Sequence, residues 1–216
     1  MTFIAMEIEI IDTNKLGRSL FAIKIIKVYS PTLIWVHLQS NQEVFRSMMK
    51  DLNRRLNSRR YAHLDPRVND IIAIETKKGW QRGIIARLNE DNTARIFLRD
   101  WGVYTQCATV DLYWLEEKFK LHHWEAIPCS LAYIGPATTG PEWSHRAIKI
   151  TKGIAEQQTG YLQVIKPNRH ETAFIRIDIR NETNNKFHNL RELLILLGVA
   201  VESATITTNT TPSIIY

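Results

Sequence analysis

Two alternating segments open the hydrophobic pattern of the chain. Residues 21–38, FAIKIIKVYSPTLIWVHL, alternate apolar residues with other residues on both sides of Ser30-Pro31. Alternation with a period of two is typical of half-buried strands, and proline is confined to edges and turns. The pattern therefore predicts two strands joined by a turn at Pro31.

The period then changes to that of a helix. Apolar residues recur every four positions, at Val44, Met48, Leu52 and Leu56. Such a stripe faces the core along one side of a helix. Ser40 and Glu43 stand at capping-box spacing, so we expect the helix to begin there. Residues 61–68 follow as a linker, because Pro66 cannot continue a helix.

Short strands and tight turns dominate from Asn69 onward. The apolar segments are DIIAIE, WQRGIIARL, TARIFLR and VYTQCATV, separated by the polar stretches TKKG, NEDN and a DWG turn. Several short strands within about forty residues predict a small, strongly bent barrel. The DWG turn is unusual, because it places the large ring of Trp101 where small polar residues usually stand.

The rest of the chain mixes helices and strands. Residues 111–124 and 143–157 are predicted helices, and GYLQVIK and TAFIRIDI form a predicted hairpin about PNRHE. A last helix, NLRELLILLG, has Asn189 placed for the N-cap and Gly198 for the C-terminus. Because the first two strands are too few to be stable alone, we expect them to complete one barrel with the late strands. The unit at 69–110 is then an insertion.

Composition narrows the class of protein. Hydrophobic residues make up 44% and charged residues 23%, which predicts a packed core. The chain has no apolar stretch near the roughly 20 residues of a membrane span, and the N-terminus does not read as a signal peptide. Cys107 and Cys129 make no disulfide framework or zinc spacing, so we expect a reducing, intracellular compartment. Neither a metal nor another cofactor is predicted.

The net charge of +6 is moderate and partly concentrated in one patch. The patch is LNRRLNSRR, which contains Arg54, Arg55, Arg59 and Arg60. These side chains could contact RNA phosphates. Arginine near a helix C-terminus is also favoured by the helix dipole without any ligand. RNA binding is therefore kept as an alternative.

Catalytic chemistry has weak support. Metal-assisted phosphodiester cleavage needs clustered carboxylates and arginines. RIDIRNE supplies these types at Arg176, Asp178, Arg180 and Glu182. The first three alternate with isoleucines, however, which is the polar face of a half-buried strand. We therefore predict a protein without catalytic residues.

The order of these elements resembles the extended Tudor domain, a Tudor (SH3-like) barrel inserted into a staphylococcal-nuclease-like OB-type barrel and joined to it by a long helix. The motifs that carry the resemblance are KVYSPTLIWVHL, DIIAIETKKGWQRGIIARL, IFLRDWGV, EAIPCSLAYIGPATTGPEW and NLRELLILLGVA. The resemblance implies a mostly β fold with helices. It divides the chain into 20–60 (first part of the nuclease-like barrel plus linker helix), 66–112 (Tudor barrel), 113–202 (second part of the nuclease-like barrel) and 203–216 (flexible tail).

In that family an aromatic cage binds methylated arginine by cation–π attraction. The cage positions fall here on Glu75, Gln81, Leu98, Trp101 and Val103. Only Trp101 keeps a ring, and the family asparagine is replaced by Val103. Trp80 and Asp100 are neighbouring, supporting residues. The resemblance thus implies a degenerate cage.

The resemblance also implies a partner. Extended Tudor domains of this kind bind Arg/Gly-rich N-terminal tails of Piwi-clade Argonautes in cytoplasmic germline granules (nuage). A carboxylate such as Glu75 or Asp100 could hold two N–H groups of one guanidinium, and methylation would remove those donors. We therefore expect binding of unmethylated arginine, with no small-molecule substrate and no membrane. A vestigial pocket on a protein–protein scaffold is the other alternative.

Overall fold

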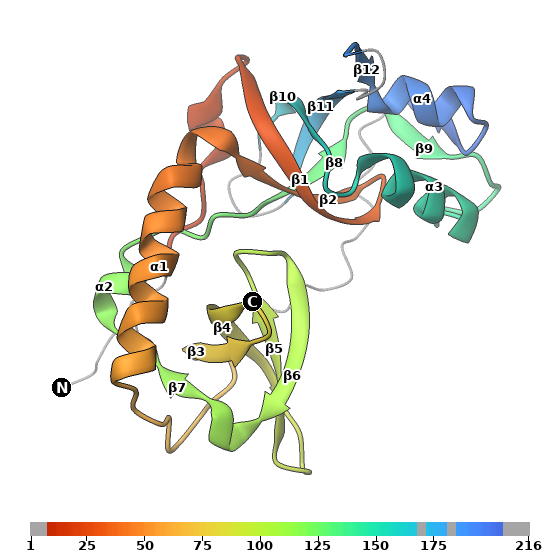
Figure 1. Cartoon of the computed structure of the whole chain (residues 1–216). Helices are drawn as coiled ribbons and strands as arrows, with labels where there is room; N and C mark the ends of the chain where they lie inside the picture. The colour runs from red at the N-terminus through yellow and green to blue at the C-terminus, as the bar shows by residue number, and fades with distance from the viewer. Residues whose placement is uncertain (1–7, 168–171, 181–184, 205–216) are drawn as a thin grey trace. The chain divides into compact units, whose positions relative to one another are not determined.

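The computed structural model describes residues 8–167, 172–180 and 185–204 (Figure 1). These residues fall into two compact units, each treated separately below. The inserted unit contains residues 8–11 and 41–126, and the split unit contains residues 12–40 together with the residues after 126. The predicted tail at 203–216 lies almost entirely outside the described residues, as does the PNRHE loop at 168–171.

The split unit is a five-stranded barrel. Its strands are β1 (Leu20–Ser30), β2 (Leu33–Leu38), β8 (Ile127–Leu131), β10 (Thr159–Lys166) and β11 (Ala173–Arg180). They pair in the order β10-β1-β2-β8-β11, and β11 pairs again with β10, which closes the barrel. β8 and β11 are parallel and the other pairs are antiparallel. The early strands do complete a barrel with the late ones, as expected from their small number.

Smaller elements complete the split unit. They are β9 (Ile134–Pro136), β12 (Phe187–Asn189), β13 (Ala200–Glu202), α3 (His145–Ala155), α4 (Leu190–Leu196) and the 3₁₀ segments at Thr13–Leu16 and Gln39–Asn41. The Ser144 hydroxyl accepts a hydrogen bond from the backbone N–H of Ala147 and so caps α3. Asn189 caps α4 in the same way, which confirms the predicted cap.

The inserted unit enters the chain between β2 and β8 and forms a five-stranded sheet. Its strands are β3 (Ile71–Thr76), β4 (Gly79–Leu88), β5 (Thr93–Leu98), β6 (Val103–Ala108) and β7 (Tyr113–Trp114), in the order β6-β5-β4-β3-β7. All pairs are antiparallel. The predicted architecture, a small barrel inserted into a second barrel, is therefore confirmed.

Two apolar clusters hold the inserted unit together. One lies inside the barrel and includes Ile72, Ile85 and Ile96, all fully buried. The other packs the barrel against α1 (Gln42–Ser58), whose Met48, Leu52 and Leu56 face Ala73, Trp80, Leu115 and Phe119. The predicted helix stripe is thus the contact between α1 and the barrel.

Two local predictions were wrong. α1 begins at Gln42 after the 3₁₀ segment Gln39–Asn41, two residues later than the predicted start at Ser40, and its N-cap residue Asn41 makes no side-chain cap hydrogen bond. Residues 111–124 are not one helix. They contain the end of a 3₁₀ segment (Thr109–Asp111), then β7 and α2 (Glu117–Lys120). Pairing of β7 with β3 overrides the local helix preference.

Candidate functional site

The β5–β6 turn presents the tryptophan that stood out in the sequence. β5 ends at Leu98, and the backbone N–H of Trp101 donates to the Leu98 carbonyl over 2.9 Å, which closes a tight turn. Gly102 then adopts a φ of +61°, a conformation that glycine takes without steric cost. The DWG sequence therefore builds a hairpin tip, with β6 restarting at Val103.

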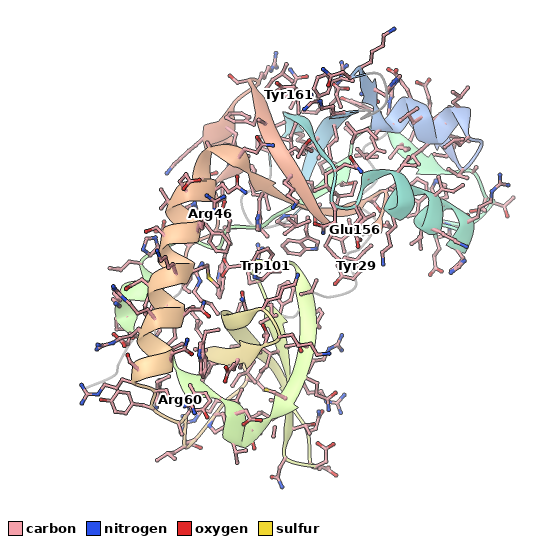
Figure 2. The ribbon with its side chains drawn as sticks, in the orientation of Figure 1. Tyr29, Arg46, Arg60, Trp101, Glu156 and Tyr161 are labelled. Carbon is pink, nitrogen blue, oxygen red and sulfur yellow. The ribbon has the colours of Figure 1, made fainter. Side chains whose placement is uncertain are left out.

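Several contacts hold the ring of Trp101, which is half-buried and labelled in Figure 2. The indole N–H donates to Gln81 Oε1 over 2.7 Å. The Phe45 ring of α1 meets it edge-on, with ring centroids 5.7 Å apart and planes at 61°. Lys78 Nζ lies over the ring, 5.8 Å from its centroid. The ring is thus fixed in direction and already faces one cation.

The structure brings four of the five predicted cage positions together. Gln81 bonds Trp101, and Leu98 pairs directly with Val103 across β5 and β6. Leu98, Trp101 and Val103 all pack against the barrel interior. Among these four positions Trp101 supplies the ring and Leu98 and Val103 supply aliphatic side chains, while Phe45 of α1 brings a second ring into contact with Trp101.

Glu75 lies apart from this group. It pairs with Trp80 across β3 and β4, whereas Gln81 pairs with Ile74, so the side chains of Glu75 and Gln81 leave opposite faces of the sheet. Glu75 Oε2 is 3.8 Å from Arg60 Nη1. Trp80 is 1% exposed and donates its indole N–H to Asn57 of α1 over 2.7 Å. These two residues belong to the α1 side of the barrel.

Asp100 is buried and fully engaged. Arg82 Nε donates to one carboxylate oxygen over 2.9 Å and Arg82 Nη2 to the other over 2.7 Å. The backbone N–H of Glu125 adds a third bond of 3.0 Å. Arg82 also donates to the carbonyls of Phe119, His122 and His123, and stacks over Trp124. Asp100 supports the turn by fastening it to residues 119–125.

A second buried carboxyl adjoins this ion pair. Glu125 is 3% exposed, and its Oε1 has no hydrogen-bond partner among the described residues. Burial, followed by the nearby charge of Asp100, raises the pKa of Glu125 to about 7, although Arg82 pulls that pKa down. Glu125 therefore carries its proton in the folded protein over much of the acidic range.

Phe45, Lys78 and Arg82 were not among the predicted site residues. Arg82 had a usable signal, since strand alternation places it on the same side as the buried Trp80 and a buried arginine needs a carboxylate. Phe45 stands beside Val44 of the predicted helix stripe, and nothing in that spacing marks a contact with Trp101. Lys78 stands in a polar turn, and nothing in its spacing marks a contact with Trp101.

Carboxylates and rings already occupy much of the predicted RNA patch. Arg54 and Arg55 lie 2.5 and 2.7 Å from Asp51 and Glu116. Arg59 lies over the Tyr61 ring at 5.6 Å. Arg60, beyond the C-terminus of α1 in Figure 2, lies near Glu75 and over Trp80 and Tyr113. The patch therefore presents less uncompensated charge than the sequence indicated.

Within the described ranges, no group of three or more His, Cys, Asp or Glu side chains could hold a metal ion. The helices found there are too short or too polar to cross a bilayer. Of the nuclease-like set, Arg176 and Asp178 pair with each other at 3.2 Å on the outer face of β11, while Glu182 lies outside the described residues.

The inserted unit is thus a small β-sheet unit that presents an oriented ring at a hairpin tip. The chain belongs to the Tudor domain family, whose model matches residues 17–133. Human Tudor domain-containing protein 6 is 23% identical over 177 residues, 80% of this chain and 8% of that protein. Mouse Tudor and KH domain-containing protein is 26% identical over 121 residues, 55% of this chain and 21% of that protein. The chain thus spans a small part of both relatives.

Solved extended Tudor domains share the whole fold. The domain of human TDRD1, in complex with a symmetrically dimethylated peptide, superposes with a TM-score of 0.80 at 15% identity, covering 92% of this chain and 96% of that one. The domain of Drosophila melanogaster Papi, in complex with an unmethylated N-terminal Piwi peptide, gives 0.71 at 19% identity, covering 85% and 99%. At such identities the likeness concerns the fold alone.

Proposed function

We propose that this chain is a non-enzymatic recognition module that binds an arginine of the N-terminal tail of a Piwi-family Argonaute at Trp101, without a requirement for methylation. One observation carries the proposal. The hairpin tip holds one oriented indole, and its predicted partners Gln81, Leu98 and Val103 supply an amide and two aliphatic walls. The extended Tudor domains of Papi and TDRD1, which share this fold, bind a Piwi peptide and a dimethylated peptide respectively.

One ring at the five predicted cage positions gives little extra binding energy for a methylated arginine over an unmethylated one. Methyl groups ease desolvation of a guanidinium and gain most where several rings surround them. One cation–π contact is worth about 0.5–2 kcal/mol, and an unmethylated guanidinium keeps all of its N–H donors. We therefore expect methylated and unmethylated arginine to bind this module equally well, within about a factor of two.

Lys78 adds a condition to this proposal. Its ammonium already lies over the Trp101 ring, so an incoming guanidinium must take its place. The Lys78 ammonium and a ligand guanidinium repel each other at such short range, and this repulsion lowers the affinity for any cationic ligand. The substitution Lys78→Ala is accordingly expected to tighten arginine binding about twofold to fivefold, at the scale of one exposed cation–π contact.

The deciding experiment is a paired calorimetric titration with one Arg/Gly-rich Argonaute tail peptide, unmethylated and symmetrically dimethylated. Wild type should bind both forms with equal affinity. Trp101→Ala should weaken both by roughly 2- to 30-fold, since one cation–π contact is lost. Trp114→Ala is the matched control, because Trp114 is 51% exposed on β7 and belongs to no predicted cage position.

Two outcomes would contradict the proposal. A clear preference for the dimethylated peptide would mean that a working cage exists. Unchanged binding by a folded Trp101→Ala variant would mean that the hairpin tip is vestigial and that another surface meets the partner. A third variant, Glu75→Ala, should leave the peptide affinity unchanged, because the Glu75 side chain faces Arg60. A location in cytoplasmic germline granules belongs to the same proposal.

A further inference from the structure

A bulge in β4 turns an arginine to the outside of the barrel. Ile85 pairs with Ile96 in the interior, and the register then shifts so that Arg87, not Ala86, pairs with Arg95. Leu88 consequently pairs with Ala94 and reaches the interior cluster. A β-bulge changes the direction in which the following side chains point. Here it turns Leu88 into the interior opposite Ala94 and places Arg87 opposite Arg95 on the outside.

The two arginines form an uncompensated pair of positive charges. Directly opposed residues on antiparallel strands have Cβ atoms about 4.5–5.5 Å apart, and like charges there are destabilising. In the described part of the chain, no carboxylate lies within 4.0 Å of either guanidinium. Five of the other six exposed arginines of the same unit do have such partners: Arg46, Arg54, Arg55, Arg60 and Arg67. The sixth, Arg59, lies over the Tyr61 ring. Asp91, at the nearby turn, instead accepts from Thr93.

Arg95 is also held in place before any ligand arrives. Its guanidinium carbon lies 4.2 Å from the centroid of the Tyr104 ring. That ring in turn stacks on Phe97, with centroids 4.7 Å apart and planes at 27°. Stacking fixes the guanidinium plane and leaves its N–H edge for hydrogen bonds, so little entropy is lost on binding an anion.

The neighbouring strand offers a place for a chain to lie. β6 ends the strand order β6-β5-β4-β3-β7, and among the described strands its hydrogen-bonded neighbour is β5. Tyr104 and Gln106 face outward from it, beside Arg95. An edge strand can pair with an extended peptide, whose alternate side chains then lie over the same face of the sheet.

We propose that Arg87 and Arg95 bind the phosphate of a phosphorylated peptide that pairs with the edge of β6. A dianionic phosphate accepts charge-assisted hydrogen bonds from both guanidinium groups and relieves their repulsion. RNA is less suited to this face. A nucleic acid strand binds through a track of cations and free ring faces, and the Tyr104 ring already contacts Arg95 and Phe97.

The test uses the whole chain and fluorescein-labelled peptides of alternating threonine and valine, with and without one central phosphoserine. Fluorescence anisotropy should show saturable binding of the phosphorylated peptide and at least tenfold weaker binding of its unphosphorylated twin. Arg87→Gln and Arg95→Gln should each weaken binding about tenfold, and Arg95→Lys less. Arg46→Gln is the matched control and should change nothing, because Arg46 lies on α1 and pairs with Glu43.

Hydrogen exchange tests the second half of the proposal. Amides of β6 should exchange more slowly when the phosphopeptide is bound, and unchanged exchange would overturn strand pairing. Equal binding of the two peptides, no saturable binding, or an equal loss with Arg46→Gln would overturn the phosphate site. Tighter binding of oligouridylate, lost on the same two substitutions, would assign the pair to RNA instead.

Discussion

β4 carries two arginines whose surroundings are opposite. Arg82 is 0% exposed, and Asp100 together with three backbone carbonyls accept its hydrogen bonds. Arg87, five residues later and beyond the bulge, is exposed and faces Arg95. A buried charge must be matched within the fold, because its desolvation is otherwise uncompensated. An exposed pair of like charges costs little and can persist where a partner supplies the anion.

The two regions also differ in what they hold in position. The Arg82–Asp100 pair fastens the hairpin tip that carries Trp101 to residues 119–125. The Arg87–Arg95 pair has no carboxylate partner in the described structure, and Arg95 contacts the Tyr104 ring of β6. One strand can thus contribute a structural arginine and a binding arginine, and the bulge at Ala86 separates them.

The largest expected effect comes from breaking the buried pair. Arg82→Met leaves the Asp100 carboxylate buried without its guanidinium, and also removes three hydrogen bonds to carbonyls. We expect the free energy of unfolding in urea to fall by about 3–5 kcal/mol. Arg54→Met is the control and should cost less than about 1 kcal/mol, because its pair with Asp51 is exposed.

The double variant Arg82→Met with Asp100→Asn completes that test. If the cost of the single change comes from a stranded charge, neutralising Asp100 should restore part of the stability. A double variant no more stable than Arg82→Met alone would show that the carbonyl bonds, rather than the ion pair, dominate.

Much of the fold follows from the sequence, and the reasons are local. Alternation located β1, β2 and the barrel strands, and the four-residue recurrence of Met48, Leu52 and Leu56 located α1. Residues 111–124 misled because Tyr113 and Trp114 suit either a helix or a strand, and only the presence of β3 decides between them.

The site was less accessible from the sequence. Family spacing located Gln81, Leu98, Trp101 and Val103, which do meet, but spacing along the chain does not show which face of a strand a residue occupies. The strand register shows that Glu75 pairs with Trp80 and so lies on the face of the sheet opposite to Gln81. The bulge that opposes Arg87 and Arg95 is likewise invisible without the partner strand.

The next effect concerns the protonation of Glu125. Its pKa of about 7 exceeds the ordinary 4.5, so the folded state holds a proton that the unfolded state has released between these values. The free energy of unfolding should therefore fall as pH rises from about 4.5 to 7, by up to roughly 3 kcal/mol. Glu125→Gln should remove this fall, stabilising the protein at pH 8 and hardly at pH 4.5.

Urea unfolding of both proteins across that pH range provides the measurement. The neighbouring ionisable residues Asp100, Arg82, His122 and His123 are present in both proteins. The lowered pKa values of the two histidines therefore contribute to the pH dependence of both. A Glu125→Gln variant that keeps the same pH dependence would show that another group titrates.

The smallest effect concerns the exposed arginine pair. Arg87→Glu places opposite charges where like charges now stand, so stability should rise by about 0.2–1 kcal/mol, measured in urea at low salt. Salt screens exposed charges, and the gain should shrink in high salt.

The same variant, Arg87→Glu, should no longer bind the phosphopeptide. If Arg87 is retained for a ligand, the substitution should raise stability and abolish binding together. Binding sites often keep side chains that the fold alone does not favour. A fall in stability would instead mean that Arg87 has a structural partner, and would remove the main reason for placing an anion there.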